Sequence, residues 1–128
     1  MNYAALIESF FEAGNRAAGS EDVRELHALR IAAKHLRYAL EILEPGGAKP
    51  LLTALKRVQR TLGDMNDAFV AAGYLEGLPS LTPRARRLPS LLRNDGEGHI
   101  AAFHRLWPRT FSTRAQKRWL TWARAAGE

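Results

Sequence analysis

The sequence predicts an all-α protein, an antiparallel helical bundle of about four main helices. Apolar residues recur every three or four positions over long stretches, whereas no stretch alternates between apolar and polar residues as a half-buried strand does. Short joints that contain glycine or proline separate the long stretches, which is typical of antiparallel bundles. The 128 residues are enough for one domain with its own core, and we expect a single domain over residues 1–128.

The first two predicted helices cover about residues 2–16 and 20–43. Ser20 is expected to cap the second helix, because its hydroxyl can accept a hydrogen bond from a free backbone N–H. Two acidic residues follow it in the first turn, where carboxylates interact favourably with the helix dipole. Pro45 and the two glycines after it end this helix.

A proline-rich connector separates the remaining helices. We expect a third helix over about 48–76 and a connector over 77–93, whose three prolines allow at most short helical turns. The next helix begins at about 94–97 and is broken at Pro108. The last helix covers about 112–126.

Composition and charge exclude several classes of protein. The chain has no cysteine, which excludes a disulfide framework and a cysteine-ligated metal site. No apolar run approaches the ~20 residues of a membrane-spanning helix, and the first residues lack the basic start of a signal peptide, so we expect a cytoplasmic protein without a membrane partner. The net charge of +6 favours anionic partners, but residues 1–83 hold 9 basic and 10 acidic residues, so the excess lies in the last third.

The second helix has apolar residues on two opposite sides. One side is a leucine stripe with alternating spacings of three and four, formed by Leu26, Leu29, Ala33, Leu36, Leu40 and Leu43. The opposite side carries Ala28, Ile31, Ala32, Ala39 and Ile42. An ordinary surface helix is polar there, so we expect both sides of this helix to be buried, with His35 as a structural residue on the second side.

Between the two apolar sides runs one narrow basic stripe, formed by His27, Arg30, Lys34, Arg37, Tyr38 and Glu41. Like charges three or four residues apart on a helix repel, and the only acidic member stands at the far end. Arginine binds phosphate oxygens in a bidentate fork and lysine supplies a point charge, so the stripe predicts one wall of a groove for an extended phosphate-rich anion. A solvated flank whose methylene stems cover the core edge gives the same pattern, and His27 alone also fits an ordinary hydrogen-bonding role.

Two segments resemble the CHAD family, the conserved histidine α-helical domain. Residues 26–41 (LHALRIAAKHLRYALE) place an arginine three residues after a histidine, then a lysine four further and an arginine three further, in an alanine- and leucine-rich helix. Residues 55–67 (LKRVQRTLGDMND) are similar to the family's leucine-glutamine, leucine-glycine and asparagine-aspartate segment. The resemblance implies a helical module that binds inorganic polyphosphate and is associated with polyphosphate granules. By position, the binding residues that it implies are His27, Arg30, Lys34, Arg37, Tyr38, Lys56 and Arg60.

The chain departs from the family in its length. Family members usually contain two such bundles related by pseudo-twofold symmetry, with the groove between them, whereas this chain has one signature helix at about 20–43 and is one half of that architecture. We therefore expect an isologous homodimer in which two basic stripes face one channel. The second apolar side of the signature helix offers a surface for this pairing.

The third helix carries further candidates on the side away from its leucines. Lys56 and Arg60 fit a solvated face from their spacing alone, and the family resemblance favours a binding role. Gly63 lies in the middle of this helix, where glycine costs ~1 kcal/mol relative to alanine. We expect a neighbouring helix to approach closely at Gly63; a local kink is the alternative.

No catalytic motif is present in the sequence. There is no glycine-rich phosphate loop, His99 and His104 are five residues apart rather than four, and no third acid accompanies Asp64 and Asp67. We expect no enzymatic activity, no cofactor and no metal. A nucleic-acid-binding basic helical protein is an alternative, which the lack of Asn, Gln and exposed aromatic residues in the stripe disfavours. An accessory module of a phosphoanhydride-cleaving enzyme is another.

Overall fold

The computed structural model describes residues 2–127, and every regular element in this range is an α-helix. The helices are α1 (Tyr3–Ala18), α2 (Val23–Leu43), α3 (Lys49–Glu76), α4 (Leu88–Thr110) and α5 (Thr113–Ala126). The predicted all-α bundle is therefore confirmed, with five helices. Met1 and Glu128, the two ends of the predicted domain 1–128, lie outside the described residues. None of the five helices is both long enough and apolar enough to cross a membrane.

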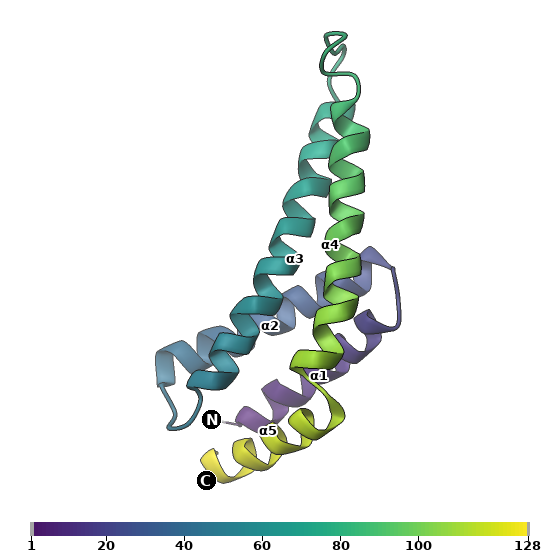
Figure 1. The fold of residues 1–128 in the computed structure, drawn as a ribbon. Coiled ribbons are helices and arrows are strands. Elements are labelled where there is room, and N and C mark those ends of the chain that lie inside the picture. Colours follow the sequence, from purple (N-terminus) through teal and green to yellow (C-terminus); the bar gives the residue numbers. More distant parts are fainter. Residues whose placement is uncertain (1, 128) are drawn as a thin grey trace.

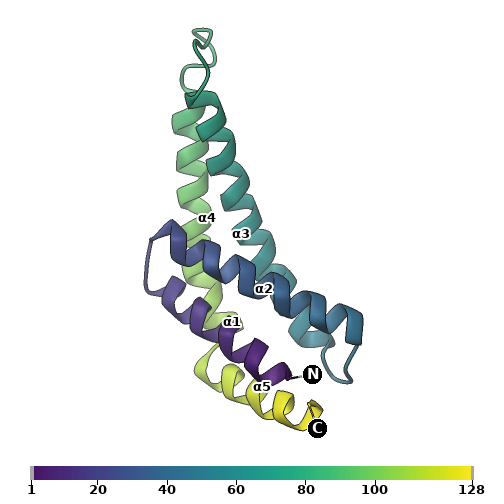
Figure 2. The ribbon, with the colours of Figure 1, turned by 180° about the vertical axis from the view of Figure 1, so that it is seen from behind.

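A long antiparallel hairpin of α3 and α4 dominates the fold; α1 and α2 pack against its lower part, and α5 packs against α1 (Figure 1). Seen from behind, α2 crosses the hairpin obliquely, with α1 and then α5 beneath it (Figure 2). The upper half of the hairpin extends beyond the other helices and ends in the loop 77–87. Because α2 contacts α1 and α3, its position depends on how its buried side fits between them.

Aromatic side chains of α1 and of the end of α4 form the centre of the core. The ring centroid of Phe10 lies 5.3 Å from that of Trp107 and 5.2 Å from that of Phe111, and both pairs meet edge to face. The indole N–H of Trp107 donates a hydrogen bond to Asn15 Oδ1 at 3.0 Å, so its polar atom is satisfied. Gly14 faces the same indole ring, which a Cβ at this position would overlap.

The start of α2 differs from the prediction by two residues. Asp22, not Ser20, is the N-cap, and its carboxylate accepts a hydrogen bond from the backbone N–H of Arg24 at 2.9 Å. The Ser20 hydroxyl accepts from the backbone N–H of Asp22 at 2.9 Å, so it stabilises the turn that precedes the helix. The predicted end is confirmed, since Leu43 is the last helical residue.

At both ends α4 is longer than the sequence predicted. It begins at Leu88 rather than at about 94–97, because the proline that follows lies in the first turn, where no helical hydrogen bond from its nitrogen is needed. The predicted break at Pro108 is wrong, because the helix continues past it for two residues. The Pro108 ring is exposed in the last turn, while Trp107 and Phe111 on either side are buried and hold this turn against α1.

Only one side of α2 is buried, so the expectation that both sides would be buried is wrong for a single chain. Five residues of the leucine stripe are at most 2% exposed: Leu26, Leu29, Ala33, Leu36 and Leu40. On the opposite side Ile31 is 43% and Ile42 is 78% exposed, and His35 is exposed rather than structural. Leu43, at the end of the stripe, is 47% exposed.

The contact between Gly14 and Trp107 predicts a stability difference between two glycines. Gly14→Ala should lower the free energy of unfolding by about 1–3 kcal/mol, because the added methyl group overpacks the aromatic core. Gly73→Ala on α3 should leave the free energy unchanged or raise it by up to about 1 kcal/mol, since nothing lies within 4 Å of its new Cβ and alanine favours the helix. Urea denaturation of both variants measures the difference, and equal effects would contradict this packing.

Candidate functional site

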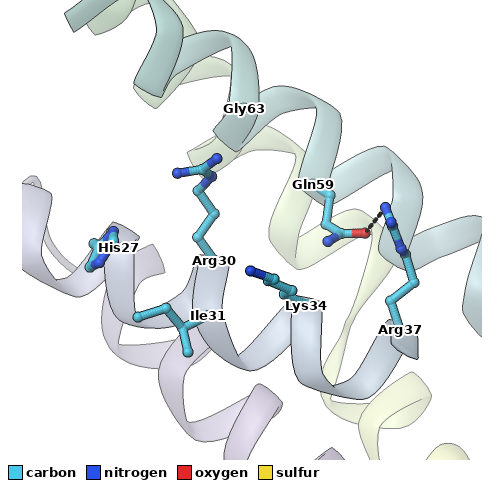
Figure 3. A pocket seen from close by; sticks show the side chains of 7 residues that line it. All are labelled: His27, Arg30, Ile31, Lys34, Arg37, Gln59 and Gly63. Carbon is cyan, nitrogen blue, oxygen red and sulfur yellow. Dashed lines mark hydrogen bonds between the residues drawn. The ribbon is translucent and has the colours of Figure 1, made fainter. Parts of the chain in front are cut away.

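A pocket of about 340 Å³ lies between α2 and α3, and basic side chains dominate its lining (Figure 3). From α2 come His27, Arg30, Ile31, Lys34 and Arg37, and from α3 come Gln59 and Gly63. Figure 3 shows that the side chains of Arg30, Lys34 and Gln59 project from the two helices into the space between them. Among these lining residues, which all belong to the described part of the chain, none is acidic.

The leucine stripe of α2 explains why the cations face α3. At ~100° per residue, Arg30 and Arg37 are the members of the basic stripe nearest in rotation to the buried leucines, so they lie at the edge of the core and are half-buried. Lys34 and His27 lie further round and are exposed. Burial of the leucines therefore fixes the rotation of α2 that directs the stripe toward α3.

Several contacts hold Arg37 at one end of the pocket. Its Nη1 donates a hydrogen bond to Gln59 Oε1 at 3.1 Å, and its Nε lies 3.4 Å from Glu41 Oε1. The guanidinium carbon also lies 5.6 Å from the centroid of the Tyr38 ring. The Glu41 carboxylate is shared, because Lys56 Nζ lies 3.9 Å from the same oxygen. Arg37 and Lys56 thus have a carboxylate counterion at this end.

Arg30 and Lys34 lie in the middle of the pocket, and no ion pair is formed by either within residues 2–127. Their spacing of four residues on one helix makes their charges repel, which costs a few tenths of a kcal/mol. The Lys34 ammonium lies 5.9 Å from the Tyr38 ring centroid, a weak compensation at an exposed site. An anion between the helices would relieve this repulsion.

A second hollow borders the pocket toward the start of α2. It has a volume of about 280 Å³ and shares His27 and Arg30 with the pocket, while Met65 and Asn66 supply its α3 side. Depressions therefore follow the crossing of α2 and α3 on both sides of Arg30. A third hollow of about 450 Å³ is lined by Glu21 and Glu97, among others, and its carboxylates would repel an anion.

The structure brings some of the predicted binding residues together and leaves others outside. His27, Arg30, Lys34 and Arg37 line the pocket. Tyr38 does not line it, and its ring packs beside Lys34 and Arg37 instead. Lys56 and Arg60 are exposed on α3 and are not among the lining residues.

Three lining residues, Ile31, Gln59 and Gly63, were not among the predicted binding residues. The expected close approach of a helix at Gly63 is wrong, because a Cβ built there meets nothing within 4 Å. The signal available for Gly63 was its position in a helix interior, where a glycine usually has a packing or functional reason. The signal available for Gln59 was its place in the segment 55–67 that resembles the family, since glutamine is otherwise an ordinary residue on a helix surface.

Within the described residues, no group of three or more His, Cys, Asp or Glu side chains is placed to hold a metal ion. The pKa of Glu76 is lowered by its hydrogen bonds with the Arg93 guanidinium, and the pKa of Asp22 is lowered by Arg24. Both pairs lie on the surface outside the pocket, so they stabilise local structure and leave the charges of the site unchanged.

Comparison with known proteins agrees with the segments that line the site. No curated protein and no solved structure matches the chain. The family model of the CHAD domain matches residues 2–76, which is more than half of the chain and includes α1, α2, α3 and every residue of the pocket lining. The chain therefore belongs to the CHAD domain family.

Proposed function

We propose that this protein binds inorganic polyphosphate in the pocket between α2 and α3 and does not catalyse its cleavage. The observation that supports the proposal most is that Arg30, Lys34 and Arg37 line one pocket without an acidic side chain among its lining residues. CHAD domains bind polyphosphate-related ligands and are generally non-catalytic, which favours a binding role for the same pocket. Association with cytoplasmic polyphosphate granules is part of this proposal.

The dimensions of the stripe suit an extended anion better than a compact one. From His27 to Arg37 the helix rises about 15 Å, with a cation at every turn of the stretch from Arg30 onward. The hollow beyond His27 extends the depression along the same crossing. A chain of linked phosphates presents negative oxygens at regular intervals, so successive units can meet successive cations.

Removal of the three arginine and lysine side chains that line the pocket should weaken binding strongly without unfolding the protein. Arg30, Lys34 and Arg37 replaced together by alanine should weaken long-chain polyphosphate binding by about 100-fold or more, since each loses a charge-assisted contact. Isothermal titration calorimetry measures the affinity, and far-ultraviolet circular dichroism should show unchanged helicity. The wild-type affinity should also fall steeply with salt, as expected when counterions are released.

A matched control separates the pocket from general charge. The control variant replaces Arg84, Arg86 and Arg87 of the loop 77–87 by alanine. It removes an equal number of positive charges, but at the far tip of the hairpin. This variant should keep the affinity within about threefold, because charges beyond a Debye length of ~8 Å are largely screened. Equal losses in the two triple variants would refute a localised site.

Competition distinguishes polyphosphate from nucleic acid as the ligand. Polyphosphate bound to the protein should resist displacement by single-stranded or double-stranded DNA and by RNA at equal phosphate concentration, because the lining offers no aromatic platform for bases. Fluorescence polarisation of labelled polyphosphate follows the displacement. Efficient displacement by any of the three nucleic acids would favour the nucleic-acid-binding alternative.

We further propose that two chains pair into a homodimer through the exposed apolar side of α2. The accessible surface is 8006 Å², whereas a compact 14.3 kDa monomer exposes about 6,800 Å², an excess of about 1,200 Å². The protruding half of the α3–α4 hairpin contributes to this excess, so the exposed isoleucines, rather than the total area, place the proposed interface on α2. Ile31 and Ile42 are exposed on this side, and Ile31 also lines the pocket, so pairing here brings two basic stripes together.

The dimer is tested by its mass and by one charge on its surface. Size-exclusion chromatography with light scattering should give twice the chain mass at micromolar concentration, and Ile42→Asp should shift the protein to monomer because it places a charge in the interface. Val70→Asp, at a 61% exposed position on α3, should leave the mass unchanged. A monomeric wild type would overturn this interface. So would a result in which Val70→Asp is monomeric and Ile42→Asp remains a dimer.

A further inference from the structure

The side of the pocket formed by α3 carries a hydrogen-bond donor with a defined orientation. Gln59 Oε1 accepts the hydrogen bond from Arg37 Nη1 at 3.1 Å. A guanidinium has donors only, so the oxygen of the amide must face Arg37 and the NH₂ group must face away from it. In Figure 3 this NH₂ group points into the pocket, toward the side of Lys34. No hydrogen bond of the NH₂ group is formed within residues 2–127, so both of its N–H bonds are available.

Gly63 leaves free space one helical turn along from Gln59. It lies inside α3, where its missing side chain costs helix stability, yet no neighbour requires glycine there, because a Cβ would meet nothing within 4 Å. Gly63 and Gln59 are four residues apart, so they lie on the same side of α3 and both line the pocket. Free space and a free donor are thus adjacent, opposite the α2 cations.

We propose that Gln59 and Gly63 form, with Arg30 and Lys34 of α2, a seat for one phosphoryl group, so that a single chain holds a short polyphosphate between its own two helices. This inference rests on the proposed function and names the residues that give the pocket its second wall. The Gln59 NH₂ group donates to a phosphate oxygen, Arg30 and Lys34 supply the charge, and the absence of a side chain at Gly63 leaves room for the phosphate. Tripolyphosphate should therefore bind with a stoichiometry of one per chain, in the monomer as well as in the dimer.

The donor role of Gln59 is tested by a change that retains its contact with Arg37. Gln59→Glu keeps an oxygen for the Arg37 guanidinium but replaces the NH₂ group with a second acceptor that repels phosphate. Tripolyphosphate affinity should fall by about tenfold or more, the value of one charge-assisted hydrogen bond. Asn94→Asp on the exposed surface of α4 changes the net charge equally and should alter the affinity by less than about twofold.

The space at Gly63 is tested by filling it. Gly63→Leu should fold as well as the wild type or better, because leucine favours the helix and its Cβ meets no neighbour. Its side chain should occupy the seat and weaken tripolyphosphate binding by about tenfold or more. Gly73→Leu, at an exposed and equally open position of the same helix, should leave the affinity within about twofold.

The outcomes separate the seat from the function on which it rests. If the wild type binds neither long-chain polyphosphate nor tripolyphosphate, the proposed function is wrong. The proposed function stands if the wild type binds both ligands and the triple alanine variant of α2 binds neither. If, in that case, Gln59→Glu and Gly63→Leu still bind tripolyphosphate as well as their controls, the seat on α3 is wrong. A stoichiometry of one tripolyphosphate per two chains in calorimetry would also overturn the seat, because it would place the ligand between chains.

Discussion

The burial of the leucine stripe between α1 and α3 is the constraint on which the site depends. Those leucines are almost fully buried, and together they remove several hundred Å² of apolar surface from water, worth several kcal/mol at about 25 cal/mol per Å². Repulsion among the neighbouring cations costs only a few tenths of a kcal/mol per pair. The apolar term therefore sets the rotation of α2, and the cations must face α3 even when no anion is present.

The balance of charges within the pocket differs between its end and its middle. At the end, Glu41 lies within 4 Å of both Arg37 and Lys56, so these two cations already have a counterion. In the middle, Arg30 and Lys34 have none within residues 2–127, and the half-buried position of Arg30 reduces its screening by water. A bound phosphate would thus gain most from Arg30 and Lys34, and it would compete with Glu41 for Arg37. The net charge of +6 contributes little to this difference, because most of the excess lies after residue 83.

Periodicity predicted what depends on local sequence and missed what depends on tertiary contacts. The helical class and the buried leucines follow from spacing, and the end of α2 follows from Pro45 and the two glycines after it. Four of the seven predicted binding residues line the pocket. The early start of α4 was missed because three prolines outweighed the weaker apolar pattern there, although one of them occupies a first-turn position that tolerates proline. Gln59 lies in the segment that resembles the family, but its contact with Arg37 could not be assigned from the sequence, because it depends on which helix α3 crosses. Gly63 was noticed, but the same signal fits both a close contact and an open space, and only the structure distinguishes them.

The crossing of α2 and α3 also changes what a second chain would contribute. Two bundles with a groove between them, the arrangement that the sequence resemblance implied, would leave one bundle with only half a site. In this chain the opposite wall is already present, because α3 brings Gln59 and Gly63 to face the cations of α2. A partner docked on the exposed side of α2 would lie beside Ile31, at the rim of the pocket, rather than across from Arg30. Its effect would be to exclude water from the rim and to place a second basic stripe alongside the first. The two stripes together would attract a long anion more strongly, and each chain would keep the proposed seat for a short one.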